Sequence, residues 1–315
     1  RAIQRRVTVT AAREEAEGVL GLTLADPTGA PLPGWSAGAH LDVVLPDGES
    51  RKYSLCGPAQ SGEWHLAVLR EDEGRGGSRW IHDTVRAGSA LRVRGPKNHF
   101  RLDEDAPAHL LIAGGIGITP ILAMADRLKR LGKDYAVHYA GRSRGRMAFL
   151  DRLERDHGAA LALHVGDEGS RADIAALVAG AAPGTQILAC GPGRLLEALE
   201  AEAAARPDVT LTVEHFGAAP ALSDPSQEAP FEVELRDSGL SLTVPADRTL
   251  LQVVRAAGID VASDCEEGLC GSCELRVASG EIDHRDRVLT GTERAAGDRI
   301  ISCCSRGRGR LVLEA

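Results

Sequence analysis

The stretch SDCEEGLCGSC, residues 263–273, places three of the chain's seven cysteines within nine positions. Cys265, Cys270 and Cys273 are separated by four and then two residues, and Cys303 lies well downstream. This C-x4-C-x2-C…C spacing is that of a plant-type [2Fe–2S] site, where a tight loop wraps the cluster and a distant strand supplies the last thiolate. The spacing therefore predicts an iron–sulfur domain at the end of the chain.

Two glycines inside the stretch support this interpretation. A loop whose backbone N–H groups point at sulfide needs unusual backbone angles, and Gly268 and Gly271 can adopt them without steric cost. Zinc is the alternative metal, but its ligands usually come as two short-spaced pairs rather than a triplet and a single. Cys304 is the uncertain neighbour of Cys303, because one of the two must point away from the metal.

The bulk composition excludes several classes of protein. A net charge of −8 argues against nucleic acid as a partner, since phosphate binding needs clustered Lys and Arg. No apolar run is long enough for a membrane span, and the start RAIQRRVTVT lacks a secretory signal. An odd cysteine count without a signal favours reduced thiols in the cytoplasm over a disulfide framework. The first residue is Arg1 rather than Met, which suggests a trimmed chain or a piece of a longer polypeptide.

The first hundred residues alternate apolar and polar positions in short runs separated by Gly, Pro and Asp turns. Many short strands at this spacing predict an antiparallel barrel or sandwich. We expect strands at 7–10, 40–46, 51–55, 64–70 and 90–96.

From Ala108 the pattern changes to buried-strand runs that alternate strictly with helical runs, which predicts a parallel sheet with helices on both faces. In the first helix we expect Thr119 as the N-cap, Pro120 at the first helical position and Gly132 at the end. The segment 217–230, GAAPALSDPSQEAP, has the composition of a linker. We therefore predict a multidomain chain divided as 1–106, 107–217, a linker 218–230, and 231–315.

This three-block order, with the ferredoxin-like block last, resembles the phthalate dioxygenase reductase family, which includes reductases of vanillate and related demethylases. The resemblance covers essentially the whole chain. It implies an FMN-binding β-barrel domain, an NAD(P)H-binding α/β domain and a β-grasp ferredoxin domain. The family's CVSR ending stands here at 303–306 and favours Cys303 as the fourth ligand. Its HRD motif stands at 284–286, where we expect His284 to be a structural hydrogen-bonding residue.

RKYSL at 51–55 resembles the R-x-Y-S motif of ferredoxin-reductase-like flavin domains. Arg51 offers a fork for a phosphate, Tyr53 can lay its ring along the flavin, and Ser54 can reach the flavin N5. Downstream, Gly76, Gly77 and Ser78 expose backbone N–H groups beside a hydroxyl where a helix is expected to start, a suitable seat for a terminal phosphate. The family's G-G-S stretch implies FMN, whereas a plain turn is the alternative.

GGIGITP at 114–120 lies where a buried strand meets a helix, although it lacks the full G-x-G-x-x-G fingerprint. Small residues there let a dinucleotide pyrophosphate approach the helix N-terminus. CGP at 190–192 ends a later strand on the same carboxyl edge, where open α/β sheets bind ligands. The expected nucleotide-binding residues are Gly114, Gly115, Gly117, Thr119, Pro120, Cys190, Gly191 and Pro192.

Three further residues are assigned to this region. By resemblance, Cys190 flanks the nicotinamide as a positioning group. Arg142 and Arg144, in GRSRGR, could hold ribose or phosphate; family habit implies NADH, and the basic turn keeps NADPH as an alternative. We place the ring of Phe216 near the flavin, with simple core packing as the alternative.

A pyridine nucleotide gives up two electrons together, a [2Fe–2S] cluster accepts one, and a flavin tolerates both regimes. The resemblance therefore implies an NADH-dependent reductase that feeds single electrons to an oxygenase component of the Rieske type. The alternatives are the reductase module of a self-sufficient cytochrome P450 fusion, a redox-sensing binding protein and a zinc-stabilised flavin reductase. Asp264, Glu266 and Glu267 form an acidic rim that could guide docking, or simply a solvated face.

Overall fold

The computed structural model describes residues 4–216, 228–263, 266, 268, 270–289 and 291–315. The chain divides into two compact units, Arg1–Phe216 and Gly217–Ala315, which are described separately below. The finer division of the first unit at residue 106 stays a prediction. Most of the expected linker, residues 217–227, lies outside the described residues.

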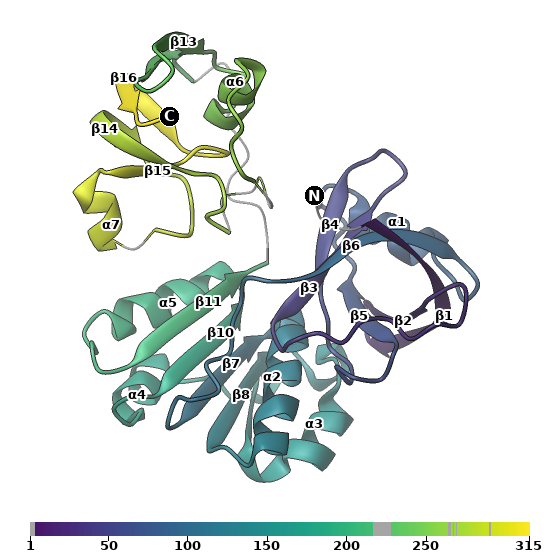
Figure 1. The fold of residues 1–315 in the computed structure, drawn as a ribbon. Coiled ribbons are helices and arrows are strands. Elements are labelled where there is room, and N and C mark those ends of the chain that lie inside the picture. The colour runs from purple at the N-terminus through teal and green to yellow at the C-terminus, as the bar shows by residue number, and fades with distance from the viewer. Residues whose placement is uncertain (1–3, 217–227, 264–265, 267, 269, 290) are drawn as a thin grey trace. The chain divides into compact units, whose positions relative to one another are not determined.

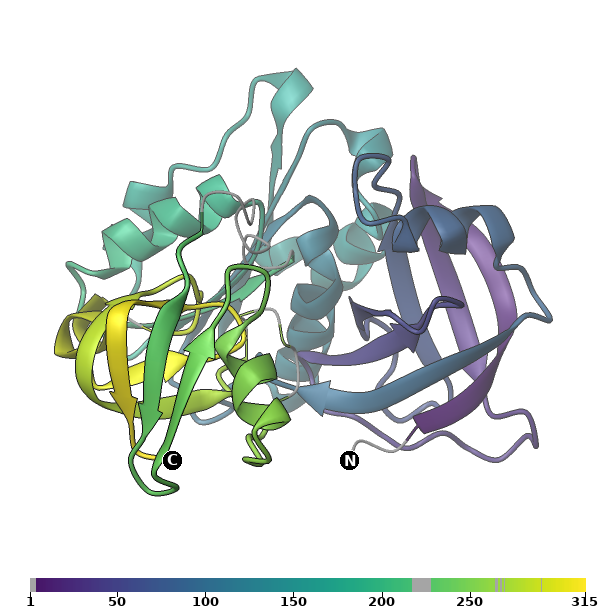
Figure 2. The same ribbon diagram turned by 90° about the horizontal axis from the view of Figure 1, so that it is seen from above.

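The N-terminal part of unit 1 is a six-stranded antiparallel sheet in the order β4-β3-β6-β1-β2-β5, which curves into an open barrel (Figures 1 and 2). An isolated bridge between Leu55 and Leu66 brings β4 to β5 and closes the curve. Its elements are β1 (Gln4–Ala16), β2 (Val19–Ala25), β3 (Ala39–Val44), β4 (Ser50–Ser54), β5 (Trp64–Leu69), β6 (Ala90–Asn98) and α1 (Gly77–Thr84).

All five expected strands of this block are confirmed, and β2 is an addition that the sequence analysis missed. β2 pairs with β1 through a two-residue connection at Glu17 and Gly18. Gly18 has φ 76, the left-handed conformation that tight hairpins require and glycine adopts freely. A Gly-containing turn between two apolar runs was the available signal for this hairpin.

The rest of unit 1 is a five-stranded, fully parallel sheet in the order β11-β10-β7-β8-β9, with helices on both faces (Figure 1). This confirms the predicted α/β block. Its strands are β7 (His109–Gly114), β8 (Tyr135–Gly141), β9 (Leu161–Val165), β10 (Gln186–Gly191) and β11 (Thr210–His215). Its helices are α2 (Ile118–Leu131), α3 (Leu150–His157), α4 (Ile174–Gly180) and α5 (Gly193–Ala203), with short 3₁₀ turns η1 (Gly115–Gly117), η2 (Arg144–Arg146), η3 (Gly158–Ala160) and η4 (Gly166–Glu168).

Alternate residues of β7 face two different cores. Leu111 and Ala113 join the large core that continues into the barrel, whereas Leu110 and Ile112 pack in the smaller core with residues of α4 and α5. The barrel and the parallel sheet thus share one hydrophobic core. A chain that buries both faces of a strand needs the near-continuous apolar run that HLLIAG supplies.

The first turn of α2 differs from the prediction. The helix begins at Ile118 with Gly117 as its N-cap, so Thr119 and Pro120 are the second and third helical residues. The Thr119 hydroxyl donates to the Ile116 carbonyl and is therefore no N-cap. The predicted end at Gly132 is confirmed, with φ 64. Within the described part of the chain, no helix combines the length and apolarity needed to cross a membrane.

Unit 2 is a five-stranded mixed sheet in the order β13-β12-β16-β14-β15, in which β12 and β16 are parallel. The Thr249 side chain accepts from the Gln252 amide while the Gln252 side chain caps the Thr249 N–H, so α6 starts with a capping box. The elements are β12 (Phe231–Leu235), β13 (Leu240–Val244), α6 (Leu250–Ala256), β14 (Glu274–Asp283), α7 (Gly291–Ala296), β15 (Arg299–Ile301) and β16 (Arg306–Leu313).

We predict that Gly38→Ala strongly destabilises unit 1. Gly38 has φ 91, and a Cβ there would lie 1.8 Å from the Phe100 carbonyl oxygen, a backbone atom that cannot move alone. We expect a loss of about 3 kcal/mol in the free energy of unfolding. Trp35, Trp64 and Trp80 all lie in unit 1, so urea unfolding followed by tryptophan fluorescence measures this unit.

The matched control is Gly29→Ala. Gly29 has φ 80, but nothing lies within 4 Å of its would-be Cβ, so only the backbone strain of about 1 kcal/mol should appear. Equal losses in the two variants would contradict the packing argument.

Candidate functional site

The barrel brings Arg51 against the first turn of α1. A Cβ on Gly77 would lie 2.6 Å from Cγ and 3.0 Å from Nε of Arg51, so only glycine lets this side chain cross the helix start. Gly76 precedes the helix with φ 81, and the Arg51 guanidinium donates to the Arg75 carbonyl at 3.2 Å. A cation and the free N–H groups of a helix start therefore lie together, which fits a phosphate group.

The other two residues of the RKYS motif end β4. Tyr53 is half-buried, and desolvation raises the pKa of its phenol. Ser54 is buried, and its hydroxyl lies 3.5 Å from Oε2 of Glu214, at the long limit of a hydrogen bond. Because Glu214 belongs to β11, this contact joins the barrel to the parallel sheet.

Glu214 is a site residue that the sequence analysis missed. It is half-buried beside Cys190, its register partner on β10, and desolvation raises the pKa of its carboxyl to about 8. At neutral pH the carboxyl therefore holds a proton next to the Ser54 hydroxyl. The acidic residue of the strand TLTVEH, two positions before Phe216, was the signal in the sequence.

The structure brings the two predicted glycine turns of the parallel sheet into direct contact. A Cβ on Gly117 would lie 2.1 Å from the Cys190 carbonyl oxygen, and one on Gly114 would lie 2.6 Å from Cδ of Pro192. Gly115, with φ 56, turns the chain from β7 toward α2. Gly114 and Gly117 are buried in this contact between side-chain-free turns, and the half-buried Gly115 lies beside it at the start of two helices, a place that fits the pyrophosphate of a dinucleotide.

Four other predicted residues of this region differ in their surroundings. Cys190 is fully buried, and desolvation raises the pKa of its thiol well above the ordinary value, which suits a positioning group rather than a nucleophile. Thr119 and Pro120 are buried in the first turn of α2. Phe216 has 41% of its surface exposed, so it is no part of the core of unit 1.

The arginines of GRSRGR follow β8, which pairs with β7 up to Gly114 and Ala140, so they begin at the same carboxyl edge of the sheet. Arg142 is exposed. The Arg144 guanidinium donates to Glu168 at 2.7 and 3.3 Å and to Glu154 at 3.2 Å. Two carboxylates therefore already compensate the charge that would attract a 2′-phosphate.

In unit 2, strand pairing brings two of the predicted iron ligands together. Cys273 directly precedes β14 and Cys303 follows β15, and these strands pair with Glu274 opposite Ile301. The hydroxyl and the N–H of Ser302 both donate to the Cys273 carbonyl, at 2.7 and 3.2 Å. The third and fourth cysteines of the motif thus lie at the same end of one strand pair.

The loop before them has the backbone that a thiolate site requires. Gly268 and Gly271 have φ 72 and 73, and the Gly268 N–H donates to Sγ of Cys303 at 3.2 Å. Cys270 is half-buried, with Sγ 3.0 Å from the Ser272 hydroxyl. Cys265 lies outside the described residues, as do Asp264 and Glu267 of the acidic rim.

Cys304, in contrast, is buried with Sγ 3.8 Å from the Ile301 carbonyl. An amide directed at Cys303 rather than Cys304 fits a cluster held by the former.

The HRD motif and the end of the CVSR-like segment form one hydrogen-bonded network. Asp286 accepts from the amides of Val288 and Leu289, and the Ser305 hydroxyl donates to it at 3.3 Å. His284 lies 3.6 Å from the same carboxylate. This network fixes the chain directly after Cys303 and Cys304. Nδ1 of His284 is buried with no hydrogen-bond partner among the described residues, so its expected role as a structural hydrogen-bonding residue stays a prediction.

Comparison with known proteins identifies relatives over the whole length. Residues 233–307 match the family described as "2Fe-2S iron-sulfur cluster binding domain". The chain is 44% identical over 302 residues to the phenoxybenzoate dioxygenase subunit beta of Ectopseudomonas oleovorans, covering 95% of this chain and 93% of the relative.

Two solved structures are similar over 99% of the chain. The structure of phthalate dioxygenase reductase, described as a modular structure for electron transfer from pyridine nucleotides to [2Fe–2S], has a TM-score of 0.72, 37% identity and 98% coverage of its chain. An intact type IV self-sufficient cytochrome P450 monooxygenase has a TM-score of 0.82 and 53% identity. The present chain spans only 41% of that longer protein.

We predict that Glu214 makes the stability of unit 1 depend on pH. Because its pKa is raised to about 8, the folded chain holds a proton that the unfolded chain releases above pH 4.5. The stability that this bound proton gives the folded chain is full below pH 4.5. It declines between pH 4.5 and about 8 and is lost above about pH 8. Urea unfolding at several pH values, followed by tryptophan fluorescence, should show the decline in the natural protein and its absence in Glu214→Gln.

Glu200→Gln, on an exposed carboxylate of α5 near His215, is the control and should keep the decline. An unchanged pH profile in Glu214→Gln would show that this carboxyl does not titrate there.

Proposed function

The chain belongs to the phthalate dioxygenase reductase family, and we propose that it passes electrons from NADH through FMN and a [2Fe–2S] cluster to an oxygenase component. The nucleotide supplies two electrons as hydride, and flavin and cluster together convert the pair into single electrons. The observation that carries the proposal is the meeting of barrel and parallel sheet at Ser54 and Glu214. We place this reaction in the cytoplasm, where thiolate ligands stay reduced.

In the barrel, we assign the FMN phosphate to Arg51, Gly76, Gly77 and Ser78. Arg51 provides the charge, and the start of α1 provides N–H groups. The Tyr53 ring would lie along the isoalloxazine. Ser54 would reach N5, and the Glu214 carboxyl, whose pKa is raised, would hold a proton behind it.

At the sheet edge, we assign the dinucleotide pyrophosphate to the bare backbone of Gly114, Gly115 and Gly117. Cys190, Gly191 and Pro192 position the nicotinamide against the flavin, and Thr119 and Pro120 hold the first turn of α2 in place. Phe216, exposed at the end of β11, supplies an aromatic face near the flavin that excludes water. Hydride transfer then depends on how the nicotinamide and the flavin are oriented toward each other, and it needs no general acid or base.

Cys265, Cys270, Cys273 and Cys303 are the proposed cluster ligands. The Gly268 N–H that reaches Cys303 would stabilise thiolate charge on this side of the cluster, which tunes its reduction potential.

Because the curated relatives include components of dioxygenase and demethylase systems, we propose an oxygenase of the Rieske type as the acceptor. A second candidate acceptor is a cytochrome P450 haem domain within a longer fusion. It is favoured by the 53% identity to the self-sufficient monooxygenase, compared with 44% to the dioxygenase subunit. Both acceptors take one electron at a time, so the roles of this chain's residues are the same.

Cys303→Ser tests the proposed electron route. In an anaerobic titration with NADH, we expect the flavin absorbance to bleach as in the natural protein, whereas the EPR signal of the reduced cluster is lost. Cys304→Ser is the matched control on the adjacent residue and should keep both signals. Loss of the cluster in Cys304→Ser but not in Cys303→Ser would reverse the ligand assignment, and a natural protein without iron or sulfide would overturn the function.

The preference for NADH is a second prediction. Glu168 and Glu154 engage Arg144, so this arginine is not available to bind a 2′-phosphate. Glu168→Gln should free part of this charge and raise kcat/KM for NADPH relative to NADH by about tenfold, the worth of one charge-assisted hydrogen bond. The gain should vanish in the double variant Glu168→Gln with Arg144→Met. If it persists there, Arg144 is not the group that receives the phosphate.

A further inference from the structure

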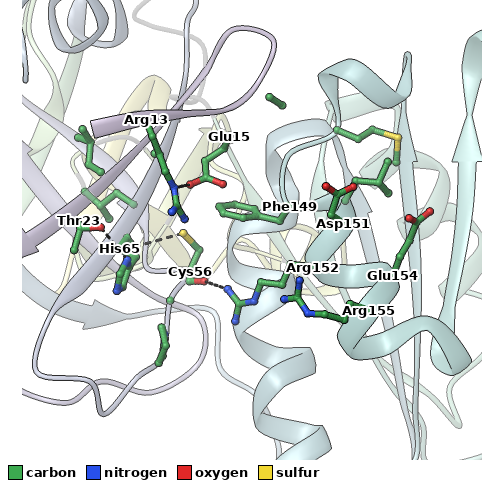
Figure 3. A pocket seen from close by; sticks show the side chains of 18 of the residues that line it. Arg13, Glu15, Thr23, Cys56, His65, Phe149, Asp151, Arg152, Glu154 and Arg155 are labelled. Carbon is green, nitrogen blue, oxygen red and sulfur yellow. Dashed lines mark hydrogen bonds and ion pairs between the residues drawn. The ribbon is translucent and has the colours of Figure 1, made fainter. Parts of the chain in front are cut away.

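A cavity of about 920 Å³ separates the outer face of the barrel from the segment that leads into α3 (Figure 3). The barrel lines it with residues of β1, β2 and β5, and the parallel-sheet block lines it with residues 144–155. Its arginines are already engaged by carboxylates, as Arg13 is by Glu15 at 2.7 Å, so we assign it no ligand. Because the cavity separates the two blocks here, close packing of side chains does not fix the barrel against α3 at this place.

Polar bridges cross the interface around the cavity instead, among them an ion pair between Arg146 and Glu17 at 3.5 Å. The Glu17 N–H donates to the Gly145 carbonyl at 2.8 Å. Nη1 of Arg152, on α3, donates to the Cys56 carbonyl at 3.3 Å (Figure 3). Cys56 itself is buried, and burial raises the pKa of its thiol to about 12, so its role here is the carbonyl.

The position of α3 is determined mainly at its C-terminal end. At the start, Phe149 takes the left-handed conformation with φ 61, and no side chain caps the helix. At the end, His157 is 2% exposed and uses both ring nitrogens: Nδ1 lies 2.8 Å from the Tyr135 hydroxyl and Nε2 lies 3.0 Å from Asp126. The carboxylate can only accept, so Nε2 carries the proton and Nδ1 accepts from the tyrosine.

The same carboxylate orients Arg152. While Oδ1 of Asp126 accepts from His157, Oδ2 accepts from Nη2 of Arg152 at 2.5 Å. The guanidinium fork is planar, so fixing Nη2 also fixes the direction of Nη1, which meets the Cys56 carbonyl. A continuous chain of hydrogen bonds therefore runs from β8 through α3 and α2 to the barrel.

We propose that Arg152, held by Asp126 and His157, is a positioning residue. It sets the distance between the flavin strand, β4, and the nucleotide edge, the carboxyl edge of the parallel sheet at residues 114–117. Cys56 lies two residues after Ser54, the residue assigned to flavin N5, and the intervening Leu55 is fixed by its N–H to the Ala39 carbonyl at 2.8 Å. The Cys56 N–H itself donates to the His65 carbonyl at 3.1 Å, so residues 54–56 form one hydrogen-bonded strand end whose position depends on both the barrel and Arg152. This inference rests on the proposed hydride transfer from NADH to FMN, whose rate is sensitive to misplacement of about 1 Å.

Arg152→Met is the main test, because it keeps the apolar stem and removes the fork. In anaerobic stopped-flow experiments, the limiting rate of flavin reduction at saturating NADH should fall by about tenfold or more, while the dissociation constant of NADH changes little. Arg152→Lys keeps an ion pair with Asp126 but cannot span both partners, so its rate should be intermediate. Asp126→Asn should also lower the limiting rate with Arg152 still present.

Hydrogen–deuterium exchange supplies a readout that is independent of activity. The backbone amides of residues 54–57 should exchange several times faster in Arg152→Met than in the natural protein, because the strand end loses one of its anchors. Arg155→Met is the matched control: this arginine lies on the same helix and lines the same cavity, but its side chain is 67% exposed and pairs with Asp156. It should leave both the limiting rate and the exchange unchanged.

The outcomes separate the two proposals. A natural protein whose flavin is not reduced by NADH would contradict the proposed function. Normal limiting rates and normal exchange at 54–57 in folded Arg152→Met and Asp126→Asn would contradict the positioning role alone. A lower unfolding temperature with unchanged limiting rate would show that the chain of hydrogen bonds is only structural.

Discussion

Two turns of the parallel sheet meet backbone to backbone at its carboxyl edge, where Gly117 lies against the Cys190 carbonyl. No side chain larger than hydrogen fits between them. This close approach aligns the start of α2 with the start of α5 and leaves an edge of N–H groups that a phosphate can approach. It also places Cys190 beside Glu214, and Glu214 reaches the barrel through Ser54.

The joint between the barrel and the parallel sheet combines two kinds of interaction. A shared apolar core holds the barrel and the parallel sheet together. A few polar contacts then set the positions of the atoms near the flavin strand, β4. Ser54 with Glu214 and Cys56 with Arg152 hold the end of β4 from two directions. Directional bonds suit this task because electron transfer as hydride depends on orientation, whereas apolar packing tolerates small shifts.

Unit 2 brings two of the proposed ligand cysteines together through strand pairing. The pairing of β14 with β15 places Cys273 and Cys303 at the same end of one strand pair, and the Gly268 N–H donates to Sγ of Cys303. Asp286 and Ser305 fix the chain beyond Cys304. Hydrogen bonds around proposed ligands of this kind orient them toward a metal.

The sequence by itself determined the architecture of all three blocks, because strand and helix periodicities, glycine turns and cysteine spacing are local signals. It indicated β4 with its RKYS motif, the parallel sheet and the end of α2 at Gly132. It misplaced the N-cap of α2, because Thr119 fits a cap by type while its hydroxyl bonds within the turn. It also missed β2, whose only signal was a two-residue turn.

Only the tertiary structure decided which residues act together across long separations in the chain. Burial against the barrel raises the pKa of the Glu214 carboxyl. Glu168 and Glu154 accept hydrogen bonds from Arg144, so this arginine is not available to another anion. Arg152 meets Cys56 across 96 positions of sequence. Desolvation and hydrogen bonding of this kind depend on neighbours that folding brings together, so no local pattern in the sequence encodes them.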